Sequence, residues 1–381
     1  MRVTYFASDL SDAAVARRVR MLRIAGADVK LLGFRRSALP VYEVEGIAAV
    51  DLGRTFDGRL GARCAQVLRR SLEAVKWRDM VSWADVVLAR NLEMVTIAEA
   101  ARVWAGSNVR LAYECLDIHG ALLGDGISSK LLRSRERRAL SRSAALIVSS
   151  HGFLTNYFER LGVDLPNVIL AENKRVLTEA DTERPQCTFN GGRPPWRIGW
   201  FGKLRCVESF QMLMGLAQRH PGLVDVELRG RPTQELQSQI TEHLPLANMR
   251  FGGSYAENDL ASVYGTCDIT WAIDYSQRGQ NSDWLLPNRI YEGSYYNSPA
   301  IALAGTETAA WLEARRTGVL LRNPRVELDP FITGLTPARY RVLKRSSADV
   351  PTCDLVWTIE GCRQFACRIT GNSRIESFCE T

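Results

Sequence analysis

The chain has 381 residues, of which 46% are hydrophobic and 24% charged, a composition typical of a globular protein long enough for two domains. No apolar run approaches the ~18–20 residues that cross a bilayer, and Asp9 comes too early for a secretory signal, so we expect a cytoplasmic protein. The net charge of +7 lies in the first half, since residues 1–168 carry 25 Lys and Arg against 18 Asp and Glu. Nine cysteines without a CxxC pair favour reduced thiols over structural zinc.

Short β-branched runs alternate with helical periodicity along the first half. The pattern predicts strands at Arg2–Ala7, Val29–Phe34, Ile47–Asp51, Asp85–Ala89, Val109–Glu114 and Ala144–Ser149. Helices are expected over 12–25, 59–80, 91–105, 128–142 and 151–161. This βαβ order predicts a mostly parallel sheet with helices on both faces.

The pattern stops in a polar stretch rich in Pro and Gly, from about Glu179 to Pro195, and then starts again. Strands are expected at Trp196–Phe201, Val224–Arg229, Met249–Gly252, Asp268–Asp274, Pro299–Leu303 and Gly318–Leu321. Helices are expected over 208–219, 233–242, 257–265, 288–297, 306–316, 336–347 and, last, 358–369. We therefore expect an α/β protein of two doubly wound, Rossmann-like domains that face each other across a cleft, where such sheets bind ligands.

Several classes of protein use two such domains: nucleotide-sugar glycosyltransferases, some epimerases, dehydrogenases and periplasmic binding proteins. The first strand leads into Ser8-Asp9-Leu10-Ser11-Asp12 without a GxGxxG, and the chain contains no P-loop. Nicotinamide and ATP chemistry are therefore disfavoured, and the missing signal peptide counts against a periplasmic protein.

The expected strand Trp196–Phe201 runs into Gly202-Lys203-Leu204-Arg205-Cys206 before a helix. Gly202 allows a close backbone turn, and Lys203 and Arg205 lie beside a helix N-terminus, where amides and a cation suit a diphosphate. The alternative is that both cations are solvated loop charges.

A second candidate segment is Leu285-Leu286-Pro287-Asn288-Arg289-Ile290-Tyr291-Glu292-Gly293. Pro287 is suited to open a helix, and Arg289 and Glu292 are three residues apart and share a face. A carboxylate just inside a helix can accept two vicinal hydroxyls such as those of ribose. The alternative is an ordinary ion pair on a surface helix.

A third candidate, Asp117 with His119, follows the expected strand Val109–Glu114. On an extended segment the two side chains point to one face, so the carboxylate could orient the imidazole as a general base toward a hydroxyl. The alternative is an Asp that caps the next helix beside a merely hydrogen-bonded His.

These segments together resemble GT-B glycosyltransferases of the large retaining family four and, more closely, exopolysaccharide glycosyltransferases of the succinoglycan type (ExoL-like). The resemblance spans residues 14 to about 310 and includes Tyr113-Glu114-Cys115-Leu116-Asp117-Ile118-His119, Glu172-Asn173-Lys174, Gly199-Trp200-Phe201-Gly202 and the segment ending in Glu292-Gly293. Family four commonly carries an E-x7-E pattern; Glu292 matches its second glutamate, whereas Trp284 occupies the first position, beside Asp283.

The resemblance implies transfer of a sugar from a nucleotide sugar, expected to be a UDP-sugar, to a lipid-linked or oligosaccharide acceptor in exopolysaccharide synthesis. It implies an acceptor-binding domain at 1–170, a linker at 171–195, a donor-binding domain at 196–355 and, at 356–381, a C-terminal helix that packs back on the first domain. Arg205 would hold the diphosphate and Glu292 the ribose; the expected donor-binding set is Gly202, Lys203, Arg205, Asn288, Arg289 and Glu292.

No DxD occurs, so we expect no metal and no cofactor. The basic first half suggests a patch, formed by Arg17, Arg18, Arg137 and Arg138, for the acceptor or for the anionic inner face of the plasma membrane; simple solubility is the alternative. A 2-epimerase of the same fold and an inert sugar-nucleotide-binding protein are alternatives to transfer. No module for nucleic acid is present.

Overall fold

A computed structural model of the chain describes residues 1–56, 60–178, 183–187 and 192–371. The chain forms two compact units: unit 1 is Met1–Glu179 with Trp357–Thr381, and unit 2 is Ala180–Val356. The predicted linker 171–195 straddles this boundary, and its residues 179–182 and 188–191 lie outside the described part, as do residues 372–381 of the predicted C-terminal segment. The linker therefore stays a prediction.

Unit 1 is built on an eight-stranded sheet in the order β3-β4-β2-β1-β5-β6-β7-β8, which is parallel except between β3 and β4. Its strands are β1 (Arg2–Ala7), β2 (Asp28–Arg35), β3 (Glu43–Val44), β4 (Ile47–Arg54), β5 (Val86–Arg90), β6 (Arg110–Cys115), β7 (Ala145–Val148) and β8 (Asn167–Leu170). Its helices are α1 (Ala13–Ile24), α2 (Leu60–Leu72), η1 (Ala74–Trp77), α3 (Arg78–Trp83), α4 (Asn91–Ala105), α5 (Gly120–Leu123), α6 (Ile127–Arg142), α7 (His151–Phe153), η2 (Leu154–Phe158), η3 (Glu159–Leu161) and α17 (Ile359–Thr370).

Adjacent residues of β6 show which helices cover which face of this sheet. Glu114 accepts a hydrogen bond from Arg18 of α1, whereas the hydroxyl of its neighbour Tyr113 donates to Glu136 of α6. Successive side chains of a strand point to opposite faces, so α1 and α6 lie on opposite sides of the sheet, as right-handed crossovers require.

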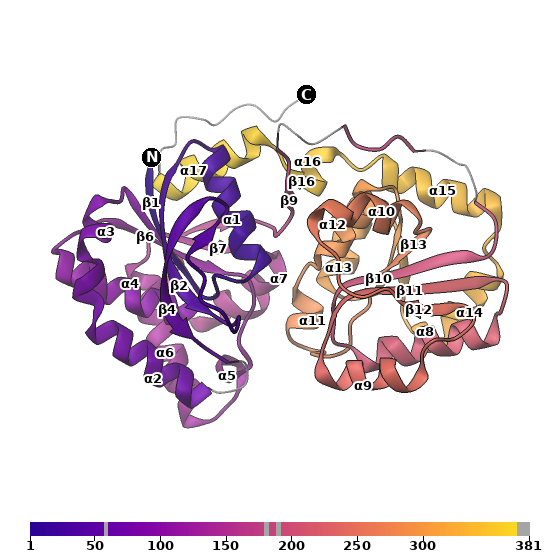
Figure 1. Ribbon diagram of the computed structural model, residues 1–381, viewed down its shortest axis with the longest axis horizontal. Coiled ribbons are helices and arrows are strands. Elements are labelled where there is room, and N and C mark those ends of the chain that lie inside the picture. Colours follow the sequence, from indigo (N-terminus) through magenta and orange to yellow (C-terminus); the bar gives the residue numbers. More distant parts are fainter. Residues whose placement is uncertain (57–59, 179–182, 188–191, 372–381) are drawn as a thin grey trace. The chain divides into compact units, whose positions relative to one another are not determined.

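The C-terminal helix α17 shares the face of α1. Its residues Cys362, Phe365 and Ile369 belong to the same buried cluster as Val15 and Val19 of α1. Figure 1 shows α17, in yellow, among the indigo and magenta elements of unit 1. Just before α17, the chain forms β16 (Val356–Trp357), which pairs with β9 (Arg175–Val176).

Unit 2 contains a six-stranded parallel sheet in the order β12-β11-β10-β13-β14-β15. The strands are β10 (Trp196–Leu204), β11 (Val224–Pro232), β12 (Met249–Phe251), β13 (Ile269–Trp271), β14 (Ala300–Leu303) and β15 (Val319–Leu321). The helices are α8 (Val207–Arg219), α9 (Gln234–His243), η4 (Glu257–Asp259), α10 (Leu260–Gly265), α11 (Asn281–Trp284), α12 (Asn288–Tyr295), α13 (Glu307–Ala314), α14 (Pro324–Thr333), α15 (Pro337–Ala348) and α16 (Thr352–Leu355). The strand order reverses between β10 and β13, and ligands of such sheets bind at this switch point.

The first strand of unit 2 is longer than the sequence predicts. It was expected to end at Phe201, but β10 continues to Leu204, and Gly202, with φ +98°, lies opposite Gly230 of β11. A Cβ on Gly230 would lie 1.8 Å from the Gly202 carbonyl oxygen, so only glycine fits there. Gly202 therefore serves strand pairing, and the expected turn at this residue is wrong.

The helix expected over 59–80 is also interrupted; its residue 59 lies outside the described part. It divides into α2, η1 and α3, and η1 turns Ala74 and the large side chain of Trp77 into the interior. Burial of an indole stabilises more than the continuation of a regular helix.

Candidate functional site

The switch point of unit 2 holds a fixed guanidinium. Arg205 follows the carboxyl end of β10 and donates through Nε to Oδ2 of Asp274, beyond the end of β13, at 2.7 Å. The other carboxylate oxygen of Asp274 accepts from the N–H and the hydroxyl of Ser276, at 2.8 and 2.5 Å. Burial raises the pKa of Asp274, but Arg205 and Ser276 outweigh it and the net pKa is lowered. The ionised carboxylate therefore orients Arg205, whose side chain is still 23% exposed.

Arg289, in the first turn of α12, is a buried cation without an anion. Its side chain donates through Nη2 to the Lys203 carbonyl at 3.2 Å and through Nη1 to the Trp271 carbonyl at 3.5 Å. Within the described residues no carboxylate lies within 4.0 Å of its guanidinium, so the alternative of an ion pair with Glu292 is wrong. Burial lowers its pKa and outweighs the attraction of Asp274, which raises it, so the charged form is only partly compensated.

Glu292, one turn further along α12, is also buried. Its Oε2 accepts from the hydroxyl of Tyr264 at 3.0 Å, and Tyr264 stacks on Tyr296 with ring centroids 5.9 Å apart. Burial and the nearby carboxylate raise the pKa of Tyr264 well above its ordinary value, so the phenol stays a donor. The ribose-binding role of Glu292 stays a prediction.

A close contact with the sheet fixes α12 in place. A Cβ on Gly293 would lie 2.5 Å from Oγ1 of Thr270 on β13 and 3.1 Å from the Ser298 carbonyl oxygen. The glycine after Glu292 thus lets the helix approach the strand, and it sets the depth at which Arg289 and Glu292 are held. Asn288 is the first residue of the helix.

The start of α8 offers fewer amides than the sequence suggested. The Cys206 thiol accepts from the N–H groups of Ser209 and Tyr275, at 3.3 and 3.2 Å. Glu208, in the first turn, binds Arg325. A helix N-terminus with one capped amide and an acidic side chain attracts an anion weakly, and Lys203 is exposed at the edge of β10. The guanidinium groups of Arg205 and Arg289 are therefore the main candidates for binding an anion here.

The position of the missing first glutamate lies in α11, where Trp284 is the last residue. Its neighbour Asp283 accepts from Arg278 at 2.5 Å and from the Gly279 N–H at 2.7 Å. Asp283 thus braces its own loop.

In unit 1, Asp117 and His119 are exposed beyond the carboxyl end of β6. His119 caps α5: its Nδ1 accepts from the Ala121 N–H at 3.2 Å. A neutral imidazole in this geometry carries its proton on Nε2, so it presents a donor. The predicted couple, in which Asp117 orients His119 as a base, is therefore not formed.

Asn91 is a candidate that the sequence reasoning missed. It follows β5 with φ +67°, and its Oδ1 is buried without a hydrogen-bond partner. The order of sheet 1 reverses between β1 and β5, which places Asn91 at the switch point of this unit. A polar residue directly after the buried run Val86–Arg90 was the available signal.

The predicted basic patch does not form one surface. Arg18 is 4% exposed and bound to Glu114, so it takes no part in any patch. Arg17 is half-buried on α1, whereas Arg137 and Arg138 are exposed on α6, on the opposite face of the sheet. Arg137 also donates to the Leu161 carbonyl at 2.7 Å. A pattern of arginines alone cannot show which ones turn inward.

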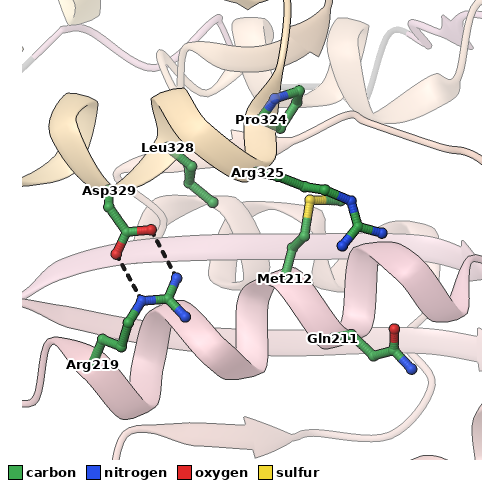
Figure 2. A pocket seen from close by; sticks show the side chains of 7 residues that line it. All are labelled: Gln211, Met212, Arg219, Pro324, Arg325, Leu328 and Asp329. Carbon is green, nitrogen blue, oxygen red and sulfur yellow. Dashed lines mark hydrogen bonds and ion pairs between the residues drawn. The ribbon is translucent and has the colours of Figure 1, made fainter.

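A pocket of about 180 Å³ lies between α8 and α14. Figure 2 shows the two hydrogen bonds between Arg219 and Asp329 on its wall, at 2.9 and 2.7 Å. Arg325, also on the wall, binds Glu208. Its charged side chains thus satisfy one another, and it includes none of the predicted site residues.

The described part of the chain shows neither a metal-binding cluster nor a membrane-spanning helix. No group of three or more His, Cys, Asp or Glu side chains could hold a metal ion there. No helix in that part of the chain is long and apolar enough to cross a membrane.

Comparison with known proteins agrees with the resemblance seen in the sequence. The chain is 39% identical over 349 residues to the succinoglycan biosynthesis protein ExoL of Rhizobium meliloti (strain 1021), covering 89% of this chain and 86% of the relative. The chain belongs to the ExoL family. No family model matches it.

Two solved structures share the fold of this ExoL-family chain. HepE of Anabaena, in complex with UDP and glucose, superposes with a TM-score of 0.66 at 15% identity, over 97% of this chain and 99% of that one. The sucrose-phosphate synthase of Thermosynechococcus elongatus superposes with a TM-score of 0.71 at 11% identity, over 97% and 98%. The predicted GT-B fold and the predicted ExoL-like family are confirmed.

Proposed function

We propose that the protein transfers a sugar from a UDP-sugar, bound by unit 2, to a lipid-linked or oligosaccharide acceptor during synthesis of a bacterial exopolysaccharide. Arg205 and Arg289 hold the diphosphate, and Glu292 accepts the ribose hydroxyls. The reaction takes place in the cytoplasm.

One observation carries this proposal: Arg289 is a buried guanidinium that lacks a carboxylate, close to a second guanidinium that Asp274 orients. An unpaired buried cation destabilises a fold unless a ligand compensates it. Two guanidiniums at the switch point match the charge of a diphosphate.

In the reaction the sugar–phosphate bond breaks and negative charge develops on the departing UDP. Two fixed guanidiniums stabilise this charge without reorganisation, because Asp274 and the carbonyls of Lys203 and Trp271 already orient them. No step here requires a metal.

One solved structure of the same fold and one relative support the choice of UDP and of pathway. HepE is described in complex with UDP and glucose, and ExoL is a succinoglycan biosynthesis protein. On the acceptor side, Asp117 is the candidate base, and His119 donates through Nε2 to the acceptor or to the transferred sugar.

The test is a thermal-shift panel with UDP, GDP, dTDP, ADP, CMP and NAD. We expect UDP to raise the melting temperature; a ligand at 100 times its Kd adds about 2.7 kcal/mol. The rise should be lost in Arg205→Ala and Glu292→Ala but kept in Arg325→Ala, which changes an exposed arginine of the same unit. Stabilisation by NAD alone, or by no nucleotide, would contradict the proposal.

Transfer is tested separately from binding. With UDP-sugar and membranes as the source of acceptor, we expect Asp117→Ala to lose transfer while it keeps the shift with UDP. If the wild type binds UDP and transfers nothing, the protein is an inert sugar-nucleotide-binding member of the family.

A further inference from the structure

Helix α2 of unit 1 has its apolar side turned to solvent. Gly61, Ala65, Leu68 and Leu72, spaced by four, three and four residues, occupy one side of the helix and are all exposed. The side chains of Leu68 and Leu72 are 63% and 74% exposed, and Val75 in the following turn is 38% exposed. We call these five residues the α2 stripe.

The opposite side of the same helix is polar and faces the protein. Arg63 lies 4.0 Å from Glu93 of α4, and Gln66 donates to the Arg54 carbonyl at the end of β4. Amphipathic helices of globular proteins normally bury their apolar side. This helix does the reverse, so the hydrophobic effect favours an occupant on the α2 stripe.

Positive charge lies beside the stripe. Residues 60–79 contain five Lys and Arg against two Asp and Glu. Arg69, Arg70 and Lys76 all lie within 3.3 Å of one carboxylate, Glu73, which can neutralise only one of them. Arg69 and Lys76 are mostly exposed, so an excess of positive charge borders the apolar residues.

We propose that the α2 stripe docks unit 1 on an anionic lipid bilayer, with Leu68, Leu72 and Val75 inserted among the acyl chains and the flanking cations on the headgroups. Apolar side chains beside basic ones are the pattern by which a helix lies in a membrane interface. A protein partner or a second copy would fit the apolar stripe, but the excess of cations favours an anionic partner. The α2 stripe replaces the predicted patch, of which Arg18 is buried.

The inference rests on the proposed function only in that a lipid-linked acceptor would lie at such a surface. The binding test contains no nucleotide and no sugar. Failure of docking and failure of transfer can therefore be told apart.

The test is flotation of the full chain with phosphatidylcholine vesicles, with or without about 30% phosphatidylglycerol. We expect binding to the anionic vesicles, weakened by an increase in salt from about 0.1 M to about 0.5 M. The double variant Leu68→Ser/Leu72→Ser should bind about tenfold less, because it loses the inserted side chains.

The matched control is Val326→Ser/Val342→Ser in unit 2, whose side chains are 65% and 70% exposed. It should bind like the wild type, and both double variants should keep the wild-type melting temperature. The proposal is overturned by equal binding to both kinds of vesicle, by binding to neither, or by unchanged binding of the Leu68→Ser/Leu72→Ser variant. A dimer of the wild type that this variant dissociates would assign the stripe to a second copy instead.

Discussion

Each unit has an arginine–carboxylate cluster at the carboxyl end of its sheet, and the two clusters differ in how their charges are paired. In unit 1, Glu114 binds Arg18 at 2.7 Å, Arg90 at 2.8 Å and the Tyr5 hydroxyl at 2.8 Å, and all four side chains are buried. In unit 2, Asp274 binds Arg205 and Ser276, and the nearby Arg289 has no carboxylate within 4.0 Å among the described residues.

The difference shows that residue type alone does not reveal a binding site. The unit 1 cluster is closed: both buried guanidiniums bind the carboxylate of Glu114 directly, so the cluster holds β6, β5 and α1 together. The unit 2 cluster is incomplete, because a buried cation lacks its anion. What separates a structural arginine from a ligand-binding one is whether the protein itself supplies the opposite charge.

The largest expected effect comes from removal of the charge in the closed cluster. Glu114→Gln keeps the shape but leaves two buried guanidiniums without an anion, which costs about 3–5 kcal/mol and lowers the melting temperature by roughly 10 °C. Calorimetry measures this. The control is Asp85→Asn, which breaks the exposed pair with Arg2 and should cost less than about 1 kcal/mol.

The stability lost in Glu114→Gln should depend on pH. Burial raises the pKa of Glu114, but Arg90 and Arg18 outweigh it and lower the pKa to about 2, from an ordinary value of 4.5. A carboxyl group whose pKa is lowered by folding stabilises the folded state at pH values above its ordinary pKa. This stabilisation is lost as the pH falls through about 2. The stability gap between wild type and Glu114→Gln should therefore shrink on acidification from about pH 4.5; a constant gap would contradict the ion-pair account.

In the incomplete cluster, Arg289→Met should cost no stability, whereas Glu114→Gln in the closed cluster does. It removes a buried uncompensated charge, so stability should stay the same or rise by about 1 kcal/mol, while affinity for UDP falls about 10–100-fold. Titration calorimetry and thermal melting give the two numbers. A variant with a lower melting temperature and normal affinity for UDP would make Arg289 structural, like Arg90.

A third buried carboxylate tests whether the arginines are what lowers the pKa of Glu114. Glu136 is as buried as Glu114, but its partners are the hydroxyls of Tyr113 and Tyr157. Burial outweighs these bonds and raises its pKa. A carboxyl group whose pKa is raised by folding stabilises the folded state at low pH, and this stabilisation is lost as the pH rises through the raised pKa. The pH dependence is therefore opposite to that of Glu114.

We therefore expect the wild type to lose stability relative to Glu136→Gln as the pH rises above the ordinary carboxyl value of 4.5. Denaturant titration at several pH values measures this. A gap that changes in the same direction as the Glu114→Gln gap would show that burial, and not the arginines, sets the behaviour of both carboxylates.

The fold was predictable from the sequence because hydrophobic periodicity is local. The alternation of buried runs such as Val86–Arg90 with amphipathic stretches predicts doubly wound sheets whatever the loops do. The misses have local causes too. Helix α14 carries Pro324 and Pro330, which hide its helical pattern, and β10 continues past Gly202, which pairs with Gly230 of β11.

The site was only partly predictable, because pairing depends on residues far apart in the sequence. Arg205 and Arg289 were expected to bind the donor, but Asp274, which orients Arg205, lies 69 residues away from it. Arg18 was expected in an exposed basic patch, yet it binds Glu114 of β6. Glu136, directly before Arg137 of the same expected patch, binds two buried tyrosines. A count of charges along the sequence does not show such partners.

The smallest expected effect concerns Asn91, which sharpens the comparison at the switch point of unit 1. A residue with φ +67° and a buried oxygen without a partner is strained in two ways, and strain of this kind collects at sites where a ligand completes the contacts. Asn91→Gly relaxes the backbone, so stability should stay the same or rise by up to about 1 kcal/mol.

If the amide of Asn91 contacts a sugar, Asn91→Gly should slow the release of UDP from the UDP-sugar in the presence of membranes by about two- to tenfold. Asn91→Asp, which keeps the shape and the left-handed conformation, should be as slow as the glycine variant if the amide donates its N–H to the ligand. A glycine variant as active as the wild type would reduce Asn91 to a turn residue, and Asp117 and His119 would be the remaining polar candidates of the unit 1 site.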